Sequence, residues 1–249
     1  MSDAASTTLP GIVYLIGAGP GAADLITVRG ARLLALADIV LHDALVTPEM
    51  LELCPQAIKI CVGKRSGQRS AAQSDINRQI IEAARKFSTV VRLKGGDPML
   101  FGRADEEMSA LEQAGIRFHI VPGITTALAA AASIRQPLTK RGVARSVALF
   151  TSSTAPGEDA QTCLPDCDTL VQYMGGKEAI LTAQRMLDAG HPTSLPIVVI
   201  ENCSRSNEVW QHMTLAELAQ GLPVCEGPVL VLMGEAMRAR VNDPTKVIA

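Results

Sequence analysis

Short runs of β-forming residues alternate with helical patterns along almost the whole chain, and no other feature restricts the fold as strongly. The expected strands are Ile12–Ile16, Asp38–Leu41, Ile58–Cys61, Thr89–Leu93, Phe118–Val121, Ser146–Phe150, Thr169–Tyr173, Ile197–Ile200 and Val229–Leu232. The expected helices are Thr27–Ala37, Ser74–Lys86, Gly102–Gln113, Thr125–Ser133, Lys177–Ala189 and Thr214–Gln220. Because such alternation is typical of α/β proteins, we expect an α/β fold with largely parallel sheets.

Hydroxyl side chains mark several of the expected helix starts. Thr27 and Ser74 stand where an N-cap is needed. Thr214, followed three residues later by Glu217, has the pattern of a capping box.

The balance of charge changes near residue 142. Residues 1–142 contain 16 Lys and Arg against 13 Asp and Glu, a net charge of +3. Residues 143–249 contain 7 against 12, a net charge of −5. We therefore expect two α/β domains, residues 1–142 and 143–249, joined by a short linker around Pro137–Arg141.

Composition excludes several classes of function. Of the 249 residues, 47% are hydrophobic and 3% aromatic, and the net charge is −2, which argues against a nucleic-acid partner. The six cysteines form no CxxC pair and have no matching His or Cys pair, so we expect reduced thiols and no metal. The first ten residues lack a signal-peptide pattern and no run reaches membrane-spanning length. We expect a soluble cytoplasmic protein.

The segment Val91–Arg103 ends a β-type run with two glycines and an Asp-Pro pair. Gly95 and Gly96 have no side chain that would hold a ligand away from the backbone. Pro98 favours an extended conformation at Asp97, which we expect to end the strand with its carboxylate displayed. These residues have the chemistry of a binding edge.

Other loops after expected strands each allow two interpretations. Gly17–Ala22 fits a loose G-x-G-x-x-A dinucleotide-binding fingerprint, or a tight strand-to-helix turn. Asp43 is a general base or ligand-orienting carboxylate, or it caps a helix near Pro48. The hydroxyls after Pro122-Gly123 meet a ligand or cap the next helix, and Met174 lines a pocket or fills a core.

Two long stretches of the chain contain basic but no acidic residues. One, residues 53–74, includes Lys64, and the other, residues 113–157, includes Arg141. Charge runs are commonly solvated faces. In a chain of net negative charge, two such runs in glycine-containing loops favour a positive cleft for a substrate with several carboxylates or phosphates.

Assembled in order, these loops resemble those of the tetrapyrrole methylase family. The motifs that carry the resemblance span nearly the whole chain: Val13–Gly21, Val62–Arg65, Arg92–Pro98, Phe101–Arg103, Val121–Thr125, Pro137–Thr139 and Val231–Glu235. The resemblance implies two α/β domains with the ligand cleft between them, S-adenosylmethionine (SAM) as co-substrate, and a homodimer. The chain departs from the family pattern at Thr151–Ser153, and Cys203 replaces a small residue.

Residue roles follow from positions within these motifs. The resemblance implies SAM contacts at Pro20, Gly95, Gly96, Asp97, Leu100, Thr125, Thr126, Met174 and Cys203. It implies catalytic roles for Asp43, Lys64 and Arg103, and tetrapyrrole contacts for Arg103, Glu106 and Arg141. It implies no metal.

The activity that the resemblance implies is methylation of uroporphyrinogen III at C2 and C7, giving precorrin-2, a precursor of siroheme, cobalamin or heme d1, and two S-adenosylhomocysteines. Asp43 or Arg103 would help to remove the ring proton, with Lys64 organising charge. Such an in-line displacement mainly needs alignment and water exclusion, and the eight carboxylates of the macrocycle match the basic stretches. The alternatives are a same-fold methylase acting on a later corrin intermediate, an NAD(P)-dependent oxidoreductase, and a non-catalytic tetrapyrrole carrier.

Overall fold

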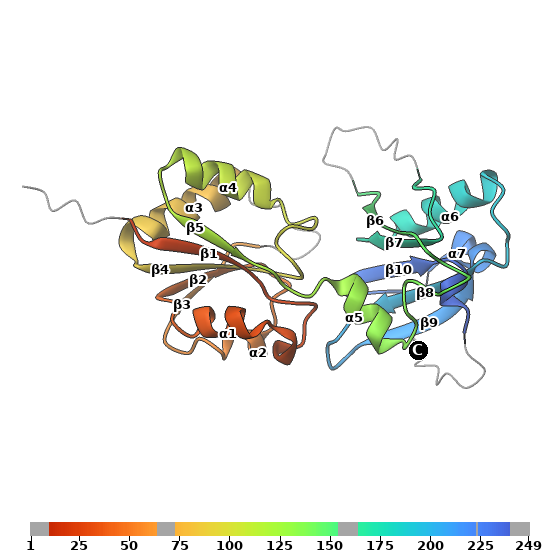
Figure 1. The fold of residues 1–249 in the computed structure, drawn as a ribbon, viewed down its shortest axis with the longest axis horizontal. Coiled ribbons are helices and arrows are strands. Elements are labelled where there is room, and N and C mark those ends of the chain that lie inside the picture. Colours follow the sequence, from red (N-terminus) through yellow and green to blue (C-terminus); the bar gives the residue numbers. More distant parts are fainter. Residues whose placement is uncertain (1–9, 64–72, 154–163, 223, 240–249) are drawn as a thin grey trace, which may run out of the picture. The chain divides into compact units, whose positions relative to one another are not determined.

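A computed structural model describes residues 10–63, 73–153, 164–222 and 224–239 (Figure 1). Packing divides the chain into two compact units, residues 1–125 and 126–249. This division places residues 126–142 in the second unit, whereas the change in charge groups them with the first. The charge-based boundary at residue 142 stays a prediction.

The first unit is built on a five-stranded sheet in which every neighbouring pair of strands is parallel. Its elements are β1 (Ile12–Gly17), the 3-10 helix η1 (Ala23–Leu25), α1 (Val28–Leu34), β2 (Ile39–His42), α2 (Pro48–Leu51), β3 (Ile58–Cys61), α3 (Gln73–Lys86), β4 (Thr89–Lys94), α4 (Ala104–Gln113) and β5 (Phe118–Val121). The strand order is β3-β2-β4-β1-β5. The prediction of a parallel sheet is confirmed for this unit.

Helices cover both faces of the first sheet. In Figure 1, α3 and α4 lie on one face and α1 and α2 on the other. Two-sided burial explains the continuous apolar strands of the sequence. Thr27 is the N-cap of α1, because its hydroxyl accepts a hydrogen bond from the Gly30 amide at 3.1 Å. The helix expected to follow Ser74 begins at Gln73, so Ser74 lies in its first turn instead of capping it.

The second unit contains a mixed sheet. Its elements are α5 (Thr126–Ser133), β6 (Val147–Thr151), β7 (Thr169–Tyr173), α6 (Glu178–Asp188), β8 (Pro196–Glu201), β9 (Val209–Thr214), α7 (Leu215–Gln220), β10 (Val229–Met233) and the 3-10 helix η2 (Glu235–Met237). The order is β6-β7-β10-β8-β9, with β6 and β7 parallel and the other described pairs antiparallel. The expectation of a largely parallel sheet is wrong here, because β10 enters between β7 and β8 in the opposite direction.

The second sheet is also covered on both faces. Figure 1 shows α6 and α7 on one face and α5 on the other, and apolar clusters fill both layers. The capping box of α7 is confirmed: Thr214 accepts from the Glu217 amide, and the Glu217 carboxylate accepts from the Thr214 amide at 2.7 Å. Within the described part of the chain, no helix combines the length and apolar character needed to cross a membrane.

Candidate functional site

Four loops meet at one edge of the first sheet. They follow β1, β2, β4 and β5, and because these strands are parallel, their carboxyl ends share an edge. The loops after β1 and β4 are joined directly: the Gly19 amide donates to the Gly96 carbonyl at 3.1 Å, and the Gly96 amide donates to the Gly19 carbonyl at 2.7 Å. In open α/β sheets this edge is where ligands bind.

Glycines allow these loops to approach so closely. A Cβ on Gly17 would lie 2.6 Å from the Cα of Gly123, closer than real Cβ atoms come. Gly96 has a φ of +67°, which glycine adopts without strain. A Cβ on Gly96 would meet no atom of the described residues within 4 Å, so one side of this backbone is open with respect to them.

Asp97 ties two of the loops together. One of its carboxylate oxygens accepts from the Met99 amide at 2.8 Å, and the other accepts from the Gly123 amide at 2.8 Å. The expectation that this carboxylate is displayed is therefore incomplete, since both oxygens already bind the backbone. The following loop contains Phe101 and Arg103 at φ values of 51° and 53°, a conformation that is uncommon for such residues and tends to occur at functional sites.

Asp43 follows β2 and is held by a buried cation. Its Oδ1 accepts from Nη2 of Arg92 at 2.5 Å, and its Oδ2 lies 3.4 Å from the Gly95 amide. The Asp43 side chain is 31% exposed, against 3% for Arg92. The helix-cap interpretation of Asp43 is wrong, because the N-cap of α2 is Thr47. Asp43 is a carboxylate at the site edge with one oxygen anchored.

Below Asp43 lies an ionic cluster that the sequence did not lead us to expect. Glu107 accepts from Nε of Arg92 and from Nζ of Lys94, both at 2.9 Å, and all three side chains are buried. Burial and the charge of Arg92 lower the pKa of Lys94, although Glu107 opposes this shift. A signal was available: Ala104, Glu107 and Leu111 share one face of α4, so Glu107 lies on its buried side.

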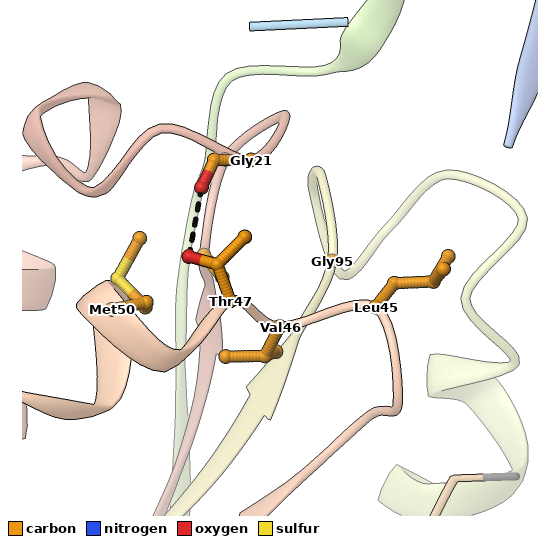
Figure 2. Close-up of a pocket in the computed structure, with 8 residues that line it drawn as sticks. Gly21, Leu45, Val46, Thr47, Met50 and Gly95 are labelled. Carbon is orange, nitrogen blue, oxygen red and sulfur yellow. Dashed lines mark hydrogen bonds between the residues drawn. The ribbon is translucent and has the colours of Figure 1, made fainter. Parts of the chain in front are cut away.

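A small pocket opens beside the Asp43 loop (Figure 2). It is lined by Ala18, Gly19, Gly21, Leu45, Val46, Thr47, Met50 and Gly95. The Thr47 hydroxyl donates to the Gly21 carbonyl at 3.1 Å and links the loops after β1 and β2. The pocket wall is thus mostly backbone and aliphatic side chains.

Arg103 and Glu106 form an exposed pair at the start of α4. The guanidinium donates to both carboxylate oxygens, at 2.6 and 2.8 Å. These hydrogen bonds raise the pKa of Arg103 and lower the pKa of Glu106. Arg141, which belongs to the second unit, is exposed in a turn closed by the Lys140–Ala144 bridge. Lys64 lies outside the described residues.

Three of the residues expected to contact SAM gather at one edge of the second sheet: Thr126, Met174 and Cys203. The amide of Ala127, next to Thr126, donates to the Tyr173 hydroxyl at 3.0 Å. The loops after β7 and β8 both border the start of β10, through bonds to residues 228 and 229. Met174 has a φ of 53° and an exposed side chain, so it does not fill the core.

The surroundings of Cys203 make its thiol unreactive. Its side chain is buried, and burial, with a smaller contribution from Glu208, raises the pKa of its thiol to about 12. Because the thiolate is the reactive form, this cysteine is neither a nucleophile nor a base. Its position in the loop after β8 leaves only packing and backbone contacts for a ligand.

The expected site residues thus form two groups, one in each unit. Pro20, Asp43, Gly95, Gly96, Asp97, Leu100, Arg103, Glu106 and Thr125 belong to the first unit, at or beside its loop edge. The dinucleotide fingerprint does not fit this geometry, because Gly17–Ala22 leads into η1 and α1 begins only at Val28. Among the described residues, no group of three His, Cys, Asp or Glu side chains is placed to hold a metal ion.

This combination defines a class: a two-unit α/β protein whose parallel sheet presents a glycine-rich ligand edge beside an anchored carboxylate. A family model described as Tetrapyrrole (Corrin/Porphyrin) Methylases matches residues 12–219. The chain belongs to the tetrapyrrole methylase family, and the resemblance seen in its motifs is confirmed.

Similar proteins agree with this assignment. Siroheme synthase 1 of Yersinia enterocolitica is 42% identical over 91% of this chain and 49% of its own length. The chain therefore spans about half the length of such curated relatives. Uroporphyrin-III C-methyl transferase of Thermus thermophilus, solved in a native form and with S-adenyl homocysteine, is 37% identical, with a TM-score of 0.79 over 91% of this chain and 98% of that one. A cobalt precorrin-4 methyltransferase is 27% identical, with a TM-score of 0.76 over 92% and 96% of the two chains.

Proposed function

We propose that this chain is a SAM-dependent C-methyltransferase that methylates uroporphyrinogen III at C2 and C7, giving precorrin-2 and two S-adenosylhomocysteines. Family membership supports the reaction class, and the similarity to the Thermus thermophilus enzyme supports the substrate. The observation that carries the proposal is the anchored carboxylate of Asp43 beside the open backbone of Gly95 and Gly96.

The glycine edge suits a ligand that approaches the backbone. Among the atoms that the structure describes, a Cβ on Gly95 would meet the Leu45 Cβ alone, at 3.8 Å, and one on Gly96 would meet none within 4 Å. We assign SAM to this edge in the first unit and to the edge bearing Thr126, Met174 and Cys203 in the second.

When bound, SAM supplies an electrophilic methyl group, and each transfer forms one C–C bond, breaks one S–C bond and leaves one proton to be removed from the macrocycle. The protein chiefly aligns the reacting atoms and excludes water, which lowers a barrier by roughly 7–11 kcal/mol in well-oriented systems. The interlocked loops after β1, β4 and β5 provide a rigid support for that alignment.

Asp43 is the proton acceptor in this mechanism. Arg92 holds its Oδ1, whereas its Oδ2 makes one contact with the described residues, at 3.4 Å from the Gly95 amide, and retains lone pairs for a substrate proton. Arg103 cannot take this role, because its guanidinium stays protonated and Glu106 raises its pKa further. Arg103 and Arg141 instead bind substrate carboxylates, Glu106 orients Arg103, and Lys64 organises charge.

The family resemblance supports the assembly that we propose, and the location is part of the same proposal. The chain acts as a homodimer in the cytoplasm. Its partner molecules are SAM and the tetrapyrrole, without nucleic acid or membrane.

The decisive experiment incubates the purified chain with SAM and uroporphyrinogen III under anaerobic conditions. Mass spectrometry should show a product heavier by two methyl groups, with two S-adenosylhomocysteines per product. Asp43→Asn should lower kcat by about 10²- to 10⁴-fold, the usual contribution of a positioned acid or base, while S-adenosylhomocysteine still binds. Asp188→Asn, an exposed position at the end of α6, is the matched control and should retain activity.

Three further measurements, with a panel of tetrapyrroles, with NADH and with the macrocycle, would reject the proposal in distinct ways. Methylation only of later corrin intermediates in a substrate panel would assign a different step to the same fold. Binding of NADH without SAM would favour an oxidoreductase. Binding of the macrocycle without SAM consumption would indicate a carrier.

A further inference from the structure

Three ionisable side chains lie almost fully buried beneath the candidate base. The side chains of Arg92 and Lys94 are each 3% exposed, and that of Glu107 is 0% exposed. They come from two elements, since Arg92 and Lys94 are on β4 and Glu107 is on α4. Buried ions cost desolvation energy, and well-packed apolar residues often replace them without loss of stability. Such a cluster therefore calls for an explanation other than stability.

The buried cluster contacts Asp43 through the guanidinium of Arg92. Glu107 Oε1 accepts from Nε of Arg92, and Glu107 Oε2 accepts from Lys94. Nη2 of the same guanidinium donates to Asp43 Oδ1. Because the guanidinium is a rigid planar fork, fixing its Nε atom also fixes the direction of Nη2.

We propose that Glu107 is a positioning residue, which acts through Arg92 to hold the Asp43 carboxylate in the orientation that accepts the substrate proton. The proposal rests on the function proposed above, because it assumes that Asp43 is the base. Arg92 has many rotamers, and without Glu107 the contacts left to it within the described part of the chain are those with Asp43 and with the Leu93 carbonyl, at 3.2 Å. Asp43, at 31% exposure, would then turn more freely.

Lys94 keeps Glu107 from binding Arg92 through both of its carboxylate oxygens. A carboxylate with two free oxygens tends to bind the Nε and Nη2 atoms of one guanidinium together. Lys94 occupies Oε2 of Glu107, so Glu107 binds Arg92 through one oxygen and Nη2 remains available for Asp43. Removal of Lys94 should let Glu107 draw Nη2 away from Asp43.

A double-mutant cycle tests whether Glu107 acts through Asp43. Glu107→Gln should lower kcat for methyl transfer by about 100-fold, the cost of an approximately 1 Å misplacement, with KM changed less than about threefold. The loss should nearly vanish in an Asp43→Asn background, because the two residues act as a unit. Glu112→Gln, the same change at an exposed position on α4, should leave kcat unchanged.

Full activity of Glu107→Gln, or losses that multiply in the double variant, would overturn the proposal. Lys94→Met provides a second cycle if Glu107→Gln fails to fold, and it should show the same dependence on Asp43. A loss in Lys94→Met that multiplies with that of Asp43→Asn would also contradict the mechanism.

A measurement without turnover separates this proposal from the proposed function. The Nε–H proton of Arg92 should exchange slowly with solvent in NMR spectra of the wild-type chain and of Asp43→Asn, and rapidly in Glu107→Gln. If wild type fails to methylate uroporphyrinogen III while this pattern holds, the function is wrong and the anchoring of Arg92 by Glu107 stands. If the proton is equally protected in Glu107→Gln, the anchoring is wrong.

Discussion

A Cβ placed on Gly123 would come within 2.2 Å of the carbonyl oxygen of Gly96. Both positions are backbone, so neither atom can rotate away as a side chain would. We expect Gly123→Ala to lower the free energy of unfolding by about 1–3 kcal/mol, the typical cost of overpacking, and to weaken S-adenosylhomocysteine binding. Urea unfolding and calorimetry measure the two effects. Gly176→Ala, whose Cβ would lie no nearer than 3.9 Å to Glu178, is the control, and an equal loss there would contradict the steric explanation.

The capping box of α7 predicts a smaller effect. Thr214→Ala removes the hydroxyl that accepts from the Glu217 amide, and we expect a loss of about 1 kcal/mol in the free energy of unfolding. Chemical denaturation followed by circular dichroism provides the measurement. Thr214→Ser keeps the hydroxyl and should retain most of the stability. Identical stability of the Ala and Ser variants would show that the cap contributes nothing.

Asp168 predicts a dependence of stability on pH. One of its carboxylate oxygens accepts from the Arg145 amide, the Ser146 amide and the Ser146 hydroxyl, and these bonds lower its pKa below the ordinary 3.8. A carboxylate with a lowered pKa stabilises the folded state above its unfolded pKa and loses that effect as pH falls through the folded value. The difference in Tm between wild type and Asp168→Asn should therefore be constant above about pH 5 and shrink below about pH 4. A Tm difference that grows as the pH falls would contradict a lowered pKa for Asp168 in the folded protein.

Cys203 predicts resistance to alkylation. Burial raises the pKa of its thiol to about 12, so almost none is thiolate at neutral pH. Treatment of the folded protein with iodoacetamide, followed by peptide mass spectrometry, should modify the exposed Cys61 well before Cys203. Equal labelling in urea would confirm that the fold, and not the local sequence, protects Cys203. Rapid labelling of Cys203 in the folded protein would refute this account.

Strands with strong β-forming runs could be predicted almost to the residue. Ile58–Cys61, Phe118–Val121 and Thr169–Tyr173 match β3, β5 and β7 as observed. Strand β9, Val209–Thr214, escaped prediction because its residues are half polar and it pairs on one side only, where tertiary contacts outweigh intrinsic preference. The direction of pairing in the second sheet depends on the insertion of β10, which no local pattern reveals.

In the candidate site, too, local features could be predicted from the sequence and tertiary contacts could not. The loop after β4 could be recognised from its glycines, because backbone permissiveness is a local property. The partners of Arg92 and Lys94 could not be predicted from the sequence. Two cations in a strand do not indicate which carboxylate on a later helix will contact them. Glu106 and Glu107 are neighbours in sequence, yet one binds an exposed arginine and the other two buried cations. The spacing of Ala104, Glu107 and Leu111 places Glu107 on the buried face of α4, but it does not identify the cations that Glu107 meets.

The pairing of Gly19 with Gly96, and of Asp97 with Gly123, has a consequence for biosynthesis. A nascent chain cannot close this end of its first unit until Gly123 has left the ribosome, although β1, which precedes the joined loop of Gly19, is made about a hundred residues earlier. Until then the apolar β1 lacks its neighbour β5 and exposes an edge. A pause in translation shortly before residue 123 would prolong that exposure and favour aggregation.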